Sequence, residues 1–372
     1  MRSQTKKEKI RYAVVGLGHI AQTAVLPAFK NASSNSELVA LISSDPKKLR
    51  TLSKRYKVET VGNYADFEDI LANAGIDAVY IATPNTCHSQ FAAVAASYGV
   101  HVLCEKPLAT TSEECFMLEE LASKHRIKAM TAYRLHFDPA NIEAIKVARS
   151  GEIGDLRIFN SVFTMQVRDP ENIRLQQRLG GGPLFDIGIY CINAARYLFG
   201  DEPLTVSAQS FSTKDPRFKD VDEMVSVTMS FPRARVANFV CSFGAADNSV
   251  FDLIGTSGSL RLENAYEYAE PMTLTVTKGD RHRKRHYKKH DQFAAELLYF
   301  SDCIQNNKRI EPSFEEGLID VEIIEALQHS LQTGEITPVK APHKVMRPSR
   351  DQKIVRPGIK PPPTIHAHAP SK

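Results

Sequence analysis

Residues 11–26, RYAVVGLGHIAQTAVL, join a short apolar strand to an apolar helix through a glycine-rich turn. The turn, residues 16–21, has the pattern G-x-G-x-x-A. Gly16 permits a tight turn, Gly18 lets the backbone approach a pyrophosphate, and Ala21 allows close packing of a helix whose N-terminus faces the anion. Placed between a strand and a helix, this pattern predicts a dinucleotide-binding site.

The same alternation of strand and helix continues through the first third of the chain. Short apolar runs recur with helical stretches between them, at residues 12–15, 38–42, 78–82, 101–104 and 128–131. Strands joined by helical crossovers are parallel, and such a sheet is covered on both faces. We therefore expect a doubly wound, Rossmann-type α/β domain over residues 1–135.

The end of the second strand, SSDPKKLR at residues 43–50, indicates which dinucleotide binds. An acidic residue at the strand tip would hold the 2′-hydroxyl of NAD. Two hydroxyls stand there instead, and three basic side chains follow that can neutralise a 2′-phosphate: Ser43, Ser44, Lys47, Lys48 and Arg50. This favours NADP. Asp45 argues for NAD, although an Asp before Pro46 is also an ordinary helix N-cap.

Two polar clusters indicate chemistry at the carboxyl edge of this sheet. Lys106 follows the strand at residues 101–104 in the triplet Glu105-Lys106-Pro107, where open α/β folds bind their ligands. The second cluster, GGGPLFDIGIY at residues 180–190, opens a helix on which Asp186 and Tyr190 share one face. Because a nearby ammonium stabilises a phenolate, Lys106 and Tyr190 form a workable acid/base pair.

From residue 155 onward the apolar pattern changes to long alternating runs, at residues 156–167, 225–231, 236–243, 249–254, 259–262 and 273–276. Alternation is typical of an antiparallel sheet with one polar face. Helices are expected at residues 139–150, 292–305 and 314–332. We therefore predict a second, α+β domain over residues 136–339, built on a large open, mostly antiparallel sheet.

Basic residues are concentrated in two places. The formal net charge is +4, but residues 340–372 alone hold eight Lys or Arg against one acid, so the remainder carries −3. This tail is rich in proline and is expected to be extended or disordered, or to wrap over another surface. A second basic run, RHRKRHYKKH, occupies residues 281–290. No nucleic-acid-binding module accompanies either run, so we expect a solvated hairpin and tail and no nucleic-acid partner.

Composition bounds the class of protein. The chain has 372 residues, 42% hydrophobic and 24% charged, which is enough for two soluble domains. No window has the ~18 consecutive apolar residues of a membrane span, and the polar N-terminus has no signal-peptide core. Six cysteines without a C-x-x-C pair or a neighbouring His suggest no zinc site and no disulfide framework. We expect a cytoplasmic protein without a metal.

The order of these motifs resembles the glucose–fructose oxidoreductase, inositol dehydrogenase and rhizopine catabolism (Gfo/Idh/MocA) family over residues 11–339. The motifs are the G-x-G-x-x-A loop, Glu105-Lys106-Pro107 and the D-x-G-x-Y of residues 186–190. Many members carry His where this chain has Tyr190. That tyrosine and the run YRLHFDP at residues 133–139 are similar to the glucose–fructose oxidoreductase branch. The resemblance implies an NADP-binding first domain and a second domain whose open sheet mediates a homodimer or homotetramer.

The resemblance also implies roles for individual residues. The pyrophosphate loop would consist of Gly16, Gly18, His19 and Ile20. The adenosine 2′-phosphate would be surrounded by Ser43, Ser44, Lys48 and Tyr64. The ribose and nicotinamide side would be lined by Pro84, Asn85 and His88. Glu105 and Lys106 would lie beside the nicotinamide, with Arg134 and Arg174 as weaker cofactor or substrate contacts.

Ordinary structural roles stay open for three of these residues. Asn85 can cap the helix that starts near Thr86. His88 can be a buried polar residue satisfied by backbone groups, and Tyr64 can be a half-buried aromatic.

From the motifs we expect an NADP-dependent sugar oxidoreductase. Tyr190, assisted by Lys106, would remove the proton of the anomeric hydroxyl as hydride leaves C1, giving a lactone, while Asp186 would hydrogen-bond a sugar hydroxyl. A second sugar can serve as hydride acceptor. Because only ten residues precede Arg11, a dehydrogenase that exchanges its NADP freely is as plausible as one that couples two sugars. The alternatives are an enzyme of a non-sugar carbonyl or diol and a dinucleotide-binding sensor, which would not need an acid/base pair.

Overall fold

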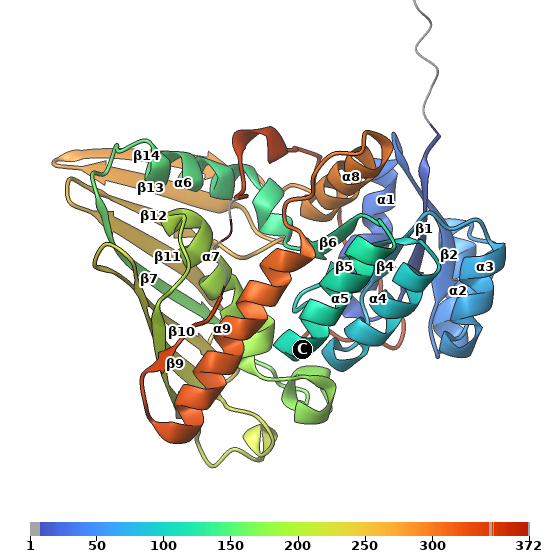
Figure 1. Ribbon diagram of the computed structural model, residues 1–372, viewed down its shortest axis with the longest axis horizontal. Coiled ribbons are helices and arrows are strands. Elements are labelled where there is room, and N and C mark those ends of the chain that lie inside the picture. Colours follow the sequence, from blue (N-terminus) through green and yellow to red (C-terminus); the bar gives the residue numbers. More distant parts are fainter. Residues whose placement is uncertain (1–7, 342–343, 345, 371–372) are drawn as a thin grey trace, which may run out of the picture.

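The computed structural model describes residues 8–341, 344 and 346–370. Figure 1 shows two sheets side by side, with the long helix α9 (Phe314–Thr333) running between them. The C-terminal end of the chain lies near the junction of the two halves in the same view.

The first sheet is parallel and has six strands within the described residues, in the order β3-β2-β1-β4-β5-β6. Its strands are β1 (Ile10–Val15), β2 (Ser36–Ile42), β3 (Thr60–Gly62), β4 (Ala78–Ile81), β5 (His101–Glu105) and β6 (Ala129–Ala132). The order reverses between β1 and β4, which leaves a crevice at their carboxyl ends. The sequence analysis missed β3, because three residues are too few to show a periodic pattern.

Helices cover both faces of this sheet, which confirms the doubly wound fold. One face packs against α1 (Leu26–Ala32), α2 (Pro46–Tyr56) and α8 (Gln292–Gln305). The other packs against α3 (Phe67–Asn73), α4 (His88–Ser97), α5 (Ser112–Lys124) and part of α9. Side chains alternate along β1, so that Tyr12 and Val14 enter the first core and Ala13 and Val15 the second. α8 covers the parallel sheet although it comes from the stretch predicted for the second domain.

The second sheet has nine strands among the described residues, in the order β14-β13-β12-β11-β7-β10-β9-β8-β15. Its longer strands are β7 (Leu156–Thr164), β8 (Thr205–Phe211), β9 (Met224–Phe231), β10 (Arg235–Ser242), β11 (Asn248–Gly255), β12 (Ser259–Glu263), β13 (Met272–Lys278) and β14 (Arg281–Tyr287). The short β15 (Thr337–Pro338) closes one edge. The helices α6 (Pro139–Arg149), α7 (Ile189–Phe199) and α9 pack with the apolar face of this sheet in one core.

The structure confirms that this sheet is mostly antiparallel. One pair of neighbouring strands is parallel, and three strands of the sheet were not predicted as such. β7 and β10 are parallel, with Ile158 opposite Val236. Alternating hydrophobicity cannot reveal this, because parallel and antiparallel neighbours can expose the same face. β8 and β15 were not predicted, and the basic run that forms β14 was predicted as a solvated hairpin but not as a strand of this sheet. β8 has a polar second half, and β14 consists almost entirely of the basic run.

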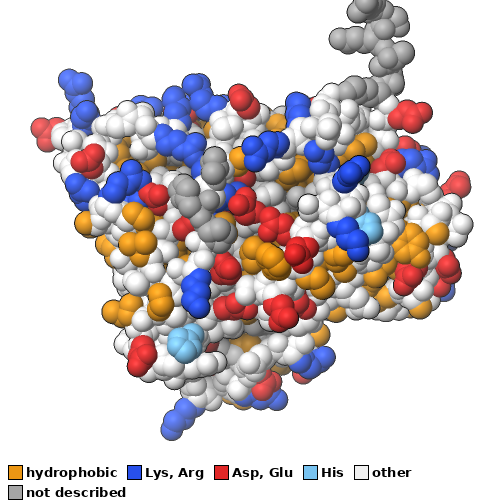
Figure 2. Space-filling view, in the orientation of Figure 1, with side chains coloured by type: hydrophobic (Ala, Val, Ile, Leu, Met, Phe, Trp, Pro, Cys, Tyr) orange, Lys and Arg blue, Asp and Glu red, His pale blue; other side chains and the backbone are white. Residues whose placement is uncertain are grey.

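The basic run forms an exposed edge of the second sheet. β14 pairs with β13 along its length, from Arg281 opposite Lys278 to Tyr287 opposite Met272. Every side chain of β14 before Tyr287 is exposed. Figure 2 shows several Lys and Arg side chains over this corner of the molecule. Charge on an edge strand discourages pairing with another chain. The solvated hairpin predicted from the sequence is therefore present.

The proline-rich tail is extended rather than helical over most of its described length and wraps over the rest of the molecule, one of the predicted alternatives. Its contacts reach both the second sheet and the parallel sheet, as described below. Within the described residues, no helix is long and apolar enough to cross a membrane.

Candidate active site

A cleft of about 530 Å³ opens at the carboxyl edge of the parallel sheet. Its wall includes every residue suggested for the site from the sequence: Gly16, Gly18, His19, Ile20, Ser43, Ser44, Lys48, Tyr64, Pro84, Asn85, His88, Glu105, Lys106, Arg134, Arg174, Asp186 and Tyr190. The end of β7 and the tail complete it with Phe163, Thr164, Met165, Ala369 and Pro370. The fold thus brings the candidate residues together, and their individual roles stay predictions.

The glycine-rich loop follows β1 and has the geometry that a pyrophosphate requires. Gly16 has φ +90°, and a Cβ there would lie 2.5 Å from the carbonyl oxygen of Ala82. A Cβ on Gly18, in contrast, would meet no protein atom within 4 Å. The chain then enters a π-helical turn, η1 (Ala21–Val25), with the buried Ala21 as its first residue. The loop therefore offers a dinucleotide an open backbone cradle at a helix N-terminus.

The end of β2 carries the cluster suggested for the 2′-phosphate. Asp45 is the N-cap of α2, because its Oδ1 accepts hydrogen bonds from the backbone N–H groups of Lys47 at 2.9 Å and Lys48 at 3.1 Å. Burial lowers the pKa of the Lys48 ammonium, partly offset by Asp45. The ring of Tyr64 packs on Phe91 with centroids 5.1 Å apart, so its half-buried aromatic role is real even though it lines the cleft.

Asn85 does not cap its own helical turn. The turn η3 (Asn85–Cys87) has no side-chain cap, and the Nδ2 of Asn85 instead donates to the carbonyl oxygen of Gly180 at 2.8 Å. Gly180 has φ +75°, and a Cβ there would lie 2.8 Å from the Cβ of Asn85. Asn85 thus ties the glycine-rich turn of the second cluster to the parallel sheet.

His88 is buried between two backbone carbonyls. Its Nδ1 lies 2.7 Å from the oxygen of Pro107, and its Nε2 lies 3.0 Å from the oxygen of Thr83. Burial lowers the pKa of His88 to about 4, although the two carbonyls favour the charged ring. The ring is therefore neutral near pH 7 and can donate to one carbonyl at a time. His88 is therefore a buried polar residue satisfied by backbone groups, which was one of the alternatives from the sequence. Its predicted place beside the ribose stays a prediction.

Lys106 is held by Asp186. Its Nζ donates to the backbone oxygen of Asp186 at 2.7 Å and to Oδ1 at 3.1 Å, while Nε of Arg174 donates to Oδ2 at 2.5 Å. Burial alone would raise the pKa of Asp186, but Arg174 and Lys106 outweigh it and keep that pKa far below its ordinary value. Burial would lower the pKa of Lys106, but Asp186, Tyr190 and Glu105 leave it raised. The pair is therefore a carboxylate and an ammonium.

Two cations lie close to the Tyr190 ring. Nζ of Lys106 and the guanidinium carbon of Arg134 are each 5.0 Å from its centroid, and only 8% of Tyr190 is exposed. Arg134 is held by hydrogen bonds to the carbonyl oxygen of Tyr266 at 2.5 Å and to the side chain of Gln292. Arg134 and Arg174 both line the cleft and also contact other site residues, and their roles as weaker cofactor or substrate contacts stay predictions.

Two further residues near Lys106 were missed in the sequence. The hydroxyl of Tyr80 donates to Oε1 of Glu105 at 2.8 Å. Burial raises the pKa of Glu105, partly countered by Lys106. Glu296 on α8 is fully buried with neither carboxyl oxygen hydrogen-bonded, and burial, together with Glu105, raises its pKa well above the ordinary range. In the sequence both residues stand in apolar runs. The one signal that could have pointed to Glu296 is that a carboxyl group stands alone inside the apolar stretch of a predicted helix.

Two family models match the chain. Residues 10–133 match the model described as an oxidoreductase family with an NAD-binding Rossmann fold, and residues 142–261 match the GFO/IDH/MocA C-terminal domain.

Three relatives illustrate what the chain is similar to. A D-xylose 1-dehydrogenase [NADP(+)] of Haloarcula marismortui is 30% identical over 87% of this chain and 91% of its own length. A dTDP-3,4-didehydro-2,6-dideoxy-alpha-D-glucose 3-reductase of Saccharopolyspora spinosa is 32% identical over 70% of this chain and 76% of its own. The crystal structure of aldose-aldose oxidoreductase from Caulobacter crescentus, complexed with glycerol, is 34% identical with a TM-score of 0.85, over 89% of this chain and 100% of that one.

Proposed function

The chain belongs to the GFO/IDH/MocA family and is an NAD(P)-dependent oxidoreductase, and from this premise we propose that it oxidises an aldose at C1 to the lactone with NADP. The membership confirms the resemblance inferred from the motifs. It also sets aside a sensor without turnover. The relatives with named activities act on sugars or sugar nucleotides, which supports a sugar substrate over a non-sugar carbonyl.

One observation carries the proposal: Tyr190 lines the cleft, and two cations, Lys106 and Arg134, each lie 5.0 Å from the centre of its ring. A positive charge beside a phenol favours the phenolate, which is the form that accepts a proton. Lys106 stays charged because Asp186 is ionised beside it. The site therefore places two cations, each held by hydrogen bonds, beside the phenol that lines the cleft.

In this proposal each residue of the site has its own role. When bound, NADP supplies the hydride acceptor. Tyr190 removes the proton of the anomeric hydroxyl, and Lys106 and Arg134 place positive charge beside the ring that does so. In the reverse direction Tyr190 returns the proton to a carbonyl oxygen. Asp186 contacts Lys106 and Arg174 through its two carboxyl oxygens and so also positions the lysine, and its hydrogen bond to a sugar hydroxyl stays a prediction.

The residues present suit NADP. The cradle at Gly18 leaves room where a side chain would fill the approach of a pyrophosphate. Ser43, Ser44 and Lys48 line the adenosine end of the cleft, where hydroxyls and an ammonium can bind a 2′-phosphate. Similarity to an NADP-dependent xylose dehydrogenase supports the same choice.

A second sugar as hydride acceptor is part of the proposal, supported by the similarity to an aldose-aldose oxidoreductase. The similarity to a keto-sugar 3-reductase favours reduction of a sugar carbonyl as the second candidate, with Tyr190 as the acid. We also propose a homo-oligomer formed through the uncovered face of the second sheet. All six cysteines are free thiols in the structure, which suits the reducing cytosol that we propose as the location.

The test uses protein purified without added cofactor. Its absorbance in the reduced-nicotinamide band is recorded while xylose, glucose and other aldoses are added singly, first without and then with NADP. A stoichiometric rise without NADP, reversed by a second sugar, supports sugar-to-sugar transfer with retained cofactor. A catalytic rise only after NADP is supplied supports an exchanging dehydrogenase. No signal with any aldose, together with oxidation of NADPH by a keto-sugar, would favour the reductase.

A further inference from the structure

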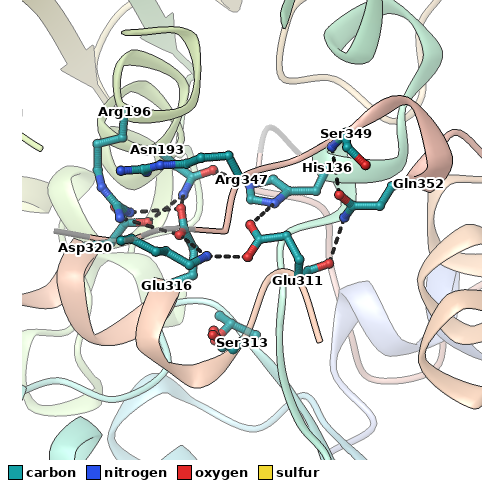
Figure 3. A network of polar contacts seen from close by, with 12 residues as sticks. His136, Asn193, Arg196, Glu311, Ser313, Glu316, Asp320, Arg347, Ser349 and Gln352 are labelled. Carbon is teal, nitrogen blue, oxygen red and sulfur yellow. Dashed lines mark hydrogen bonds and ion pairs between the residues drawn. The ribbon is translucent and has the colours of Figure 1, made fainter. Parts of the chain in front are cut away.

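The C-terminal tail is anchored at its start by buried charges. The Lys344 ammonium is fully buried and forms ion pairs with Glu311 and with Glu316, the latter at 2.5 Å. Nε2 of Gln352 donates to the backbone oxygen of Glu311 at 2.7 Å, a contact visible in Figure 3. The first part of the tail is therefore a fixed part of the fold.

The middle of the tail then crosses to the parallel sheet. The backbone N–H of Asp291 donates to the carbonyl oxygen of Arg356 at 3.0 Å, and Nδ2 of Asn31 donates to that of Pro357 at 2.9 Å. Ile354 packs against the core formed with α1 and α8. These contacts direct the remaining residues toward the dinucleotide loop.

The last described residues are bonded to that loop through Gln22. The Gln22 side chain is fully buried and pairs with the backbone of Ile365, donating from Nε2 to its oxygen at 2.9 Å and accepting its N–H at 2.8 Å. The same Nε2 donates to the carbonyl oxygen of Leu17, inside the G-x-G-x-x-A loop, at 2.9 Å. One side chain thus links the tail to the backbone that faces a pyrophosphate.

Beyond this link the tail borders the cleft. Nδ1 of His366 lies 2.7 Å from Oδ2 of Asp45, the carboxyl oxygen that does not cap α2. Ala369 and Pro370 line the cleft itself. The carbonyl oxygen of Pro370 accepts a hydrogen bond from the N–H of Arg168, which follows β7, at 3.2 Å. The tail therefore runs from the adenosine end of the cleft to the second sheet.

The carboxylate of Asp45 is unfavourable for the binding of NADP, and its contact with His366 offsets this unfavourable effect. Asp45 is the one acid among residues 43–50, and a carboxylate there suits the 2′-hydroxyl of NAD and repels a 2′-phosphate. The hydrogen bond with His366, more than any other contact, lowers the pKa of Asp45, so the group is ionised. The imidazole of His366 engages Oδ2, the carboxyl oxygen of Asp45 that the helix cap leaves unused, three residues before Lys48.

We propose that residues 363–370 form the outer wall of the dinucleotide site and that His366, by pairing with Asp45, makes its adenosine end accept a 2′-phosphate. His366 is thus a specificity-determining residue supplied by the end of the chain. The inference rests on the NADP preference in the proposed function and does not depend on which sugar is oxidised.

The test measures dissociation constants for NADP and NAD, without any sugar, by calorimetry on the full-length protein. His366→Ala is expected to weaken NADP about tenfold, equivalent to about 1.4 kcal/mol, and to leave NAD within about twofold. His368→Ala is the matched control, because it removes an exposed imidazole two residues away that has no contact with Asp45. In an Asp45→Asn background the His366→Ala change should have little effect on NADP, because the carboxylate that His366 engages is gone.

A second variant tests the role of residues 363–370 as the outer wall of the site, separately from the pairing of His366 with Asp45. A stop after Lys360 removes the described residues at the cleft and keeps the anchors at Lys344 and Gln352. It is expected to raise the dissociation rate of NADPH severalfold and to weaken NAD as well, with an unchanged circular dichroism spectrum.

Three results would overturn the inference. One is NADP affinity in His366→Ala equal to that of the parent, and another is an equal loss for NADP and NAD. The third is a truncated protein that releases NADPH at the parent rate. Parent protein that binds NADP but oxidises no aldose would instead contradict the proposed function alone, and parent protein that binds neither dinucleotide would contradict both.

Discussion

The ammonium of Lys106 lies 5.0 Å from the centre of the Tyr190 ring, and two hydrogen bonds to Asp186 hold it there. The two residues come from opposite sides of the cleft, since Lys106 follows β5 of the parallel sheet and Tyr190 begins the helix that packs on the second sheet. A change in how the two sheets meet would therefore separate the proposed base from its cation.

Replacing Tyr190 by Phe should lower kcat for aldose oxidation by about 10²–10⁴-fold, the usual contribution of a general base. The dissociation constant for NADP should stay within about twofold, because the loop at Gly16 and Gly18 is untouched. Stopped-flow absorbance and calorimetry measure the two quantities. The exposed Tyr98→Phe is the control, since its hydroxyl bonds only Glu68 at 3.1 Å on the surface. Near-normal turnover in Tyr190→Phe would remove this residue from the chemistry.

Replacing Asp186 by Asn should act through Lys106. Loss of the carboxylate removes the main charge that raises the pKa of the Lys106 ammonium, so the alkaline limb of the pH–kcat profile should move to lower pH. A loosened lysine should also cost about 10²-fold in kcat at neutral pH. Asp186→Glu should restore part of both. An alkaline limb that stays in place in Asp186→Asn would show that Asp186 does not act on Lys106.

His88 should make stability depend on pH. Its pKa is about 4 in the folded protein and ordinarily 6.5, so the unfolded chain binds more protons between these values. Stability should therefore fall as pH drops from 6.5 toward 4, by on the order of 3 kcal/mol for this residue. Urea unfolding at several pH values should show a shallower fall in His88→Asn than in the parent. Identical slopes would mean that His88 is not buried in neutral form.

Replacing Gly16 by Ala should affect mainly the stability of the fold, whereas replacing Gly18 by Ala should affect mainly the affinity for NADP. Gly16→Ala places a Cβ against the carbonyl of Ala82 at positive φ, so it should lower the free energy of unfolding by about 1–3 kcal/mol. Gly18→Ala meets no protein atom, so the fold should keep its melting temperature while the affinity for NADP drops at least about tenfold. Differential scanning fluorimetry with and without NADP separates the two. A Gly18→Ala protein that binds NADP like the parent would contradict the cradle.

The features that could be predicted from sequence are those decided by local sterics. The G-x-G-x-x-A turn needs a glycine at positive φ, and the continuous apolar run of β1 suits a strand covered on both faces, so the loop and the parallel sheet follow from short stretches. Lys106 and Tyr190 could be paired because each stands at the edge of an element whose place in the fold was predictable.

Contacts between distant segments could not be predicted in the same way. Arg134 contacts Tyr190 only because Gln292 and the carbonyl of Tyr266 fix its guanidinium. The parallel pairing of β7 with β10 and the return of α8 to the first sheet depend on chain path rather than on periodicity. The tail looked like a solvated basic arm, because nothing in its composition shows that Lys344 fits between two buried carboxylates.

The central claim is the oxidation of an aldose by direct hydride transfer to NADP beside Tyr190. Its most direct test is to incubate the protein with NADP and D-xylose or D-glucose carrying deuterium at C1, and to record the proton NMR spectrum of the reduced nucleotide. The account predicts one deuterium at C4 of the dihydronicotinamide and loss of the transfer in Tyr190→Phe. Absence of reduced nucleotide with every aldose, or reduced nucleotide without deuterium, would contradict it.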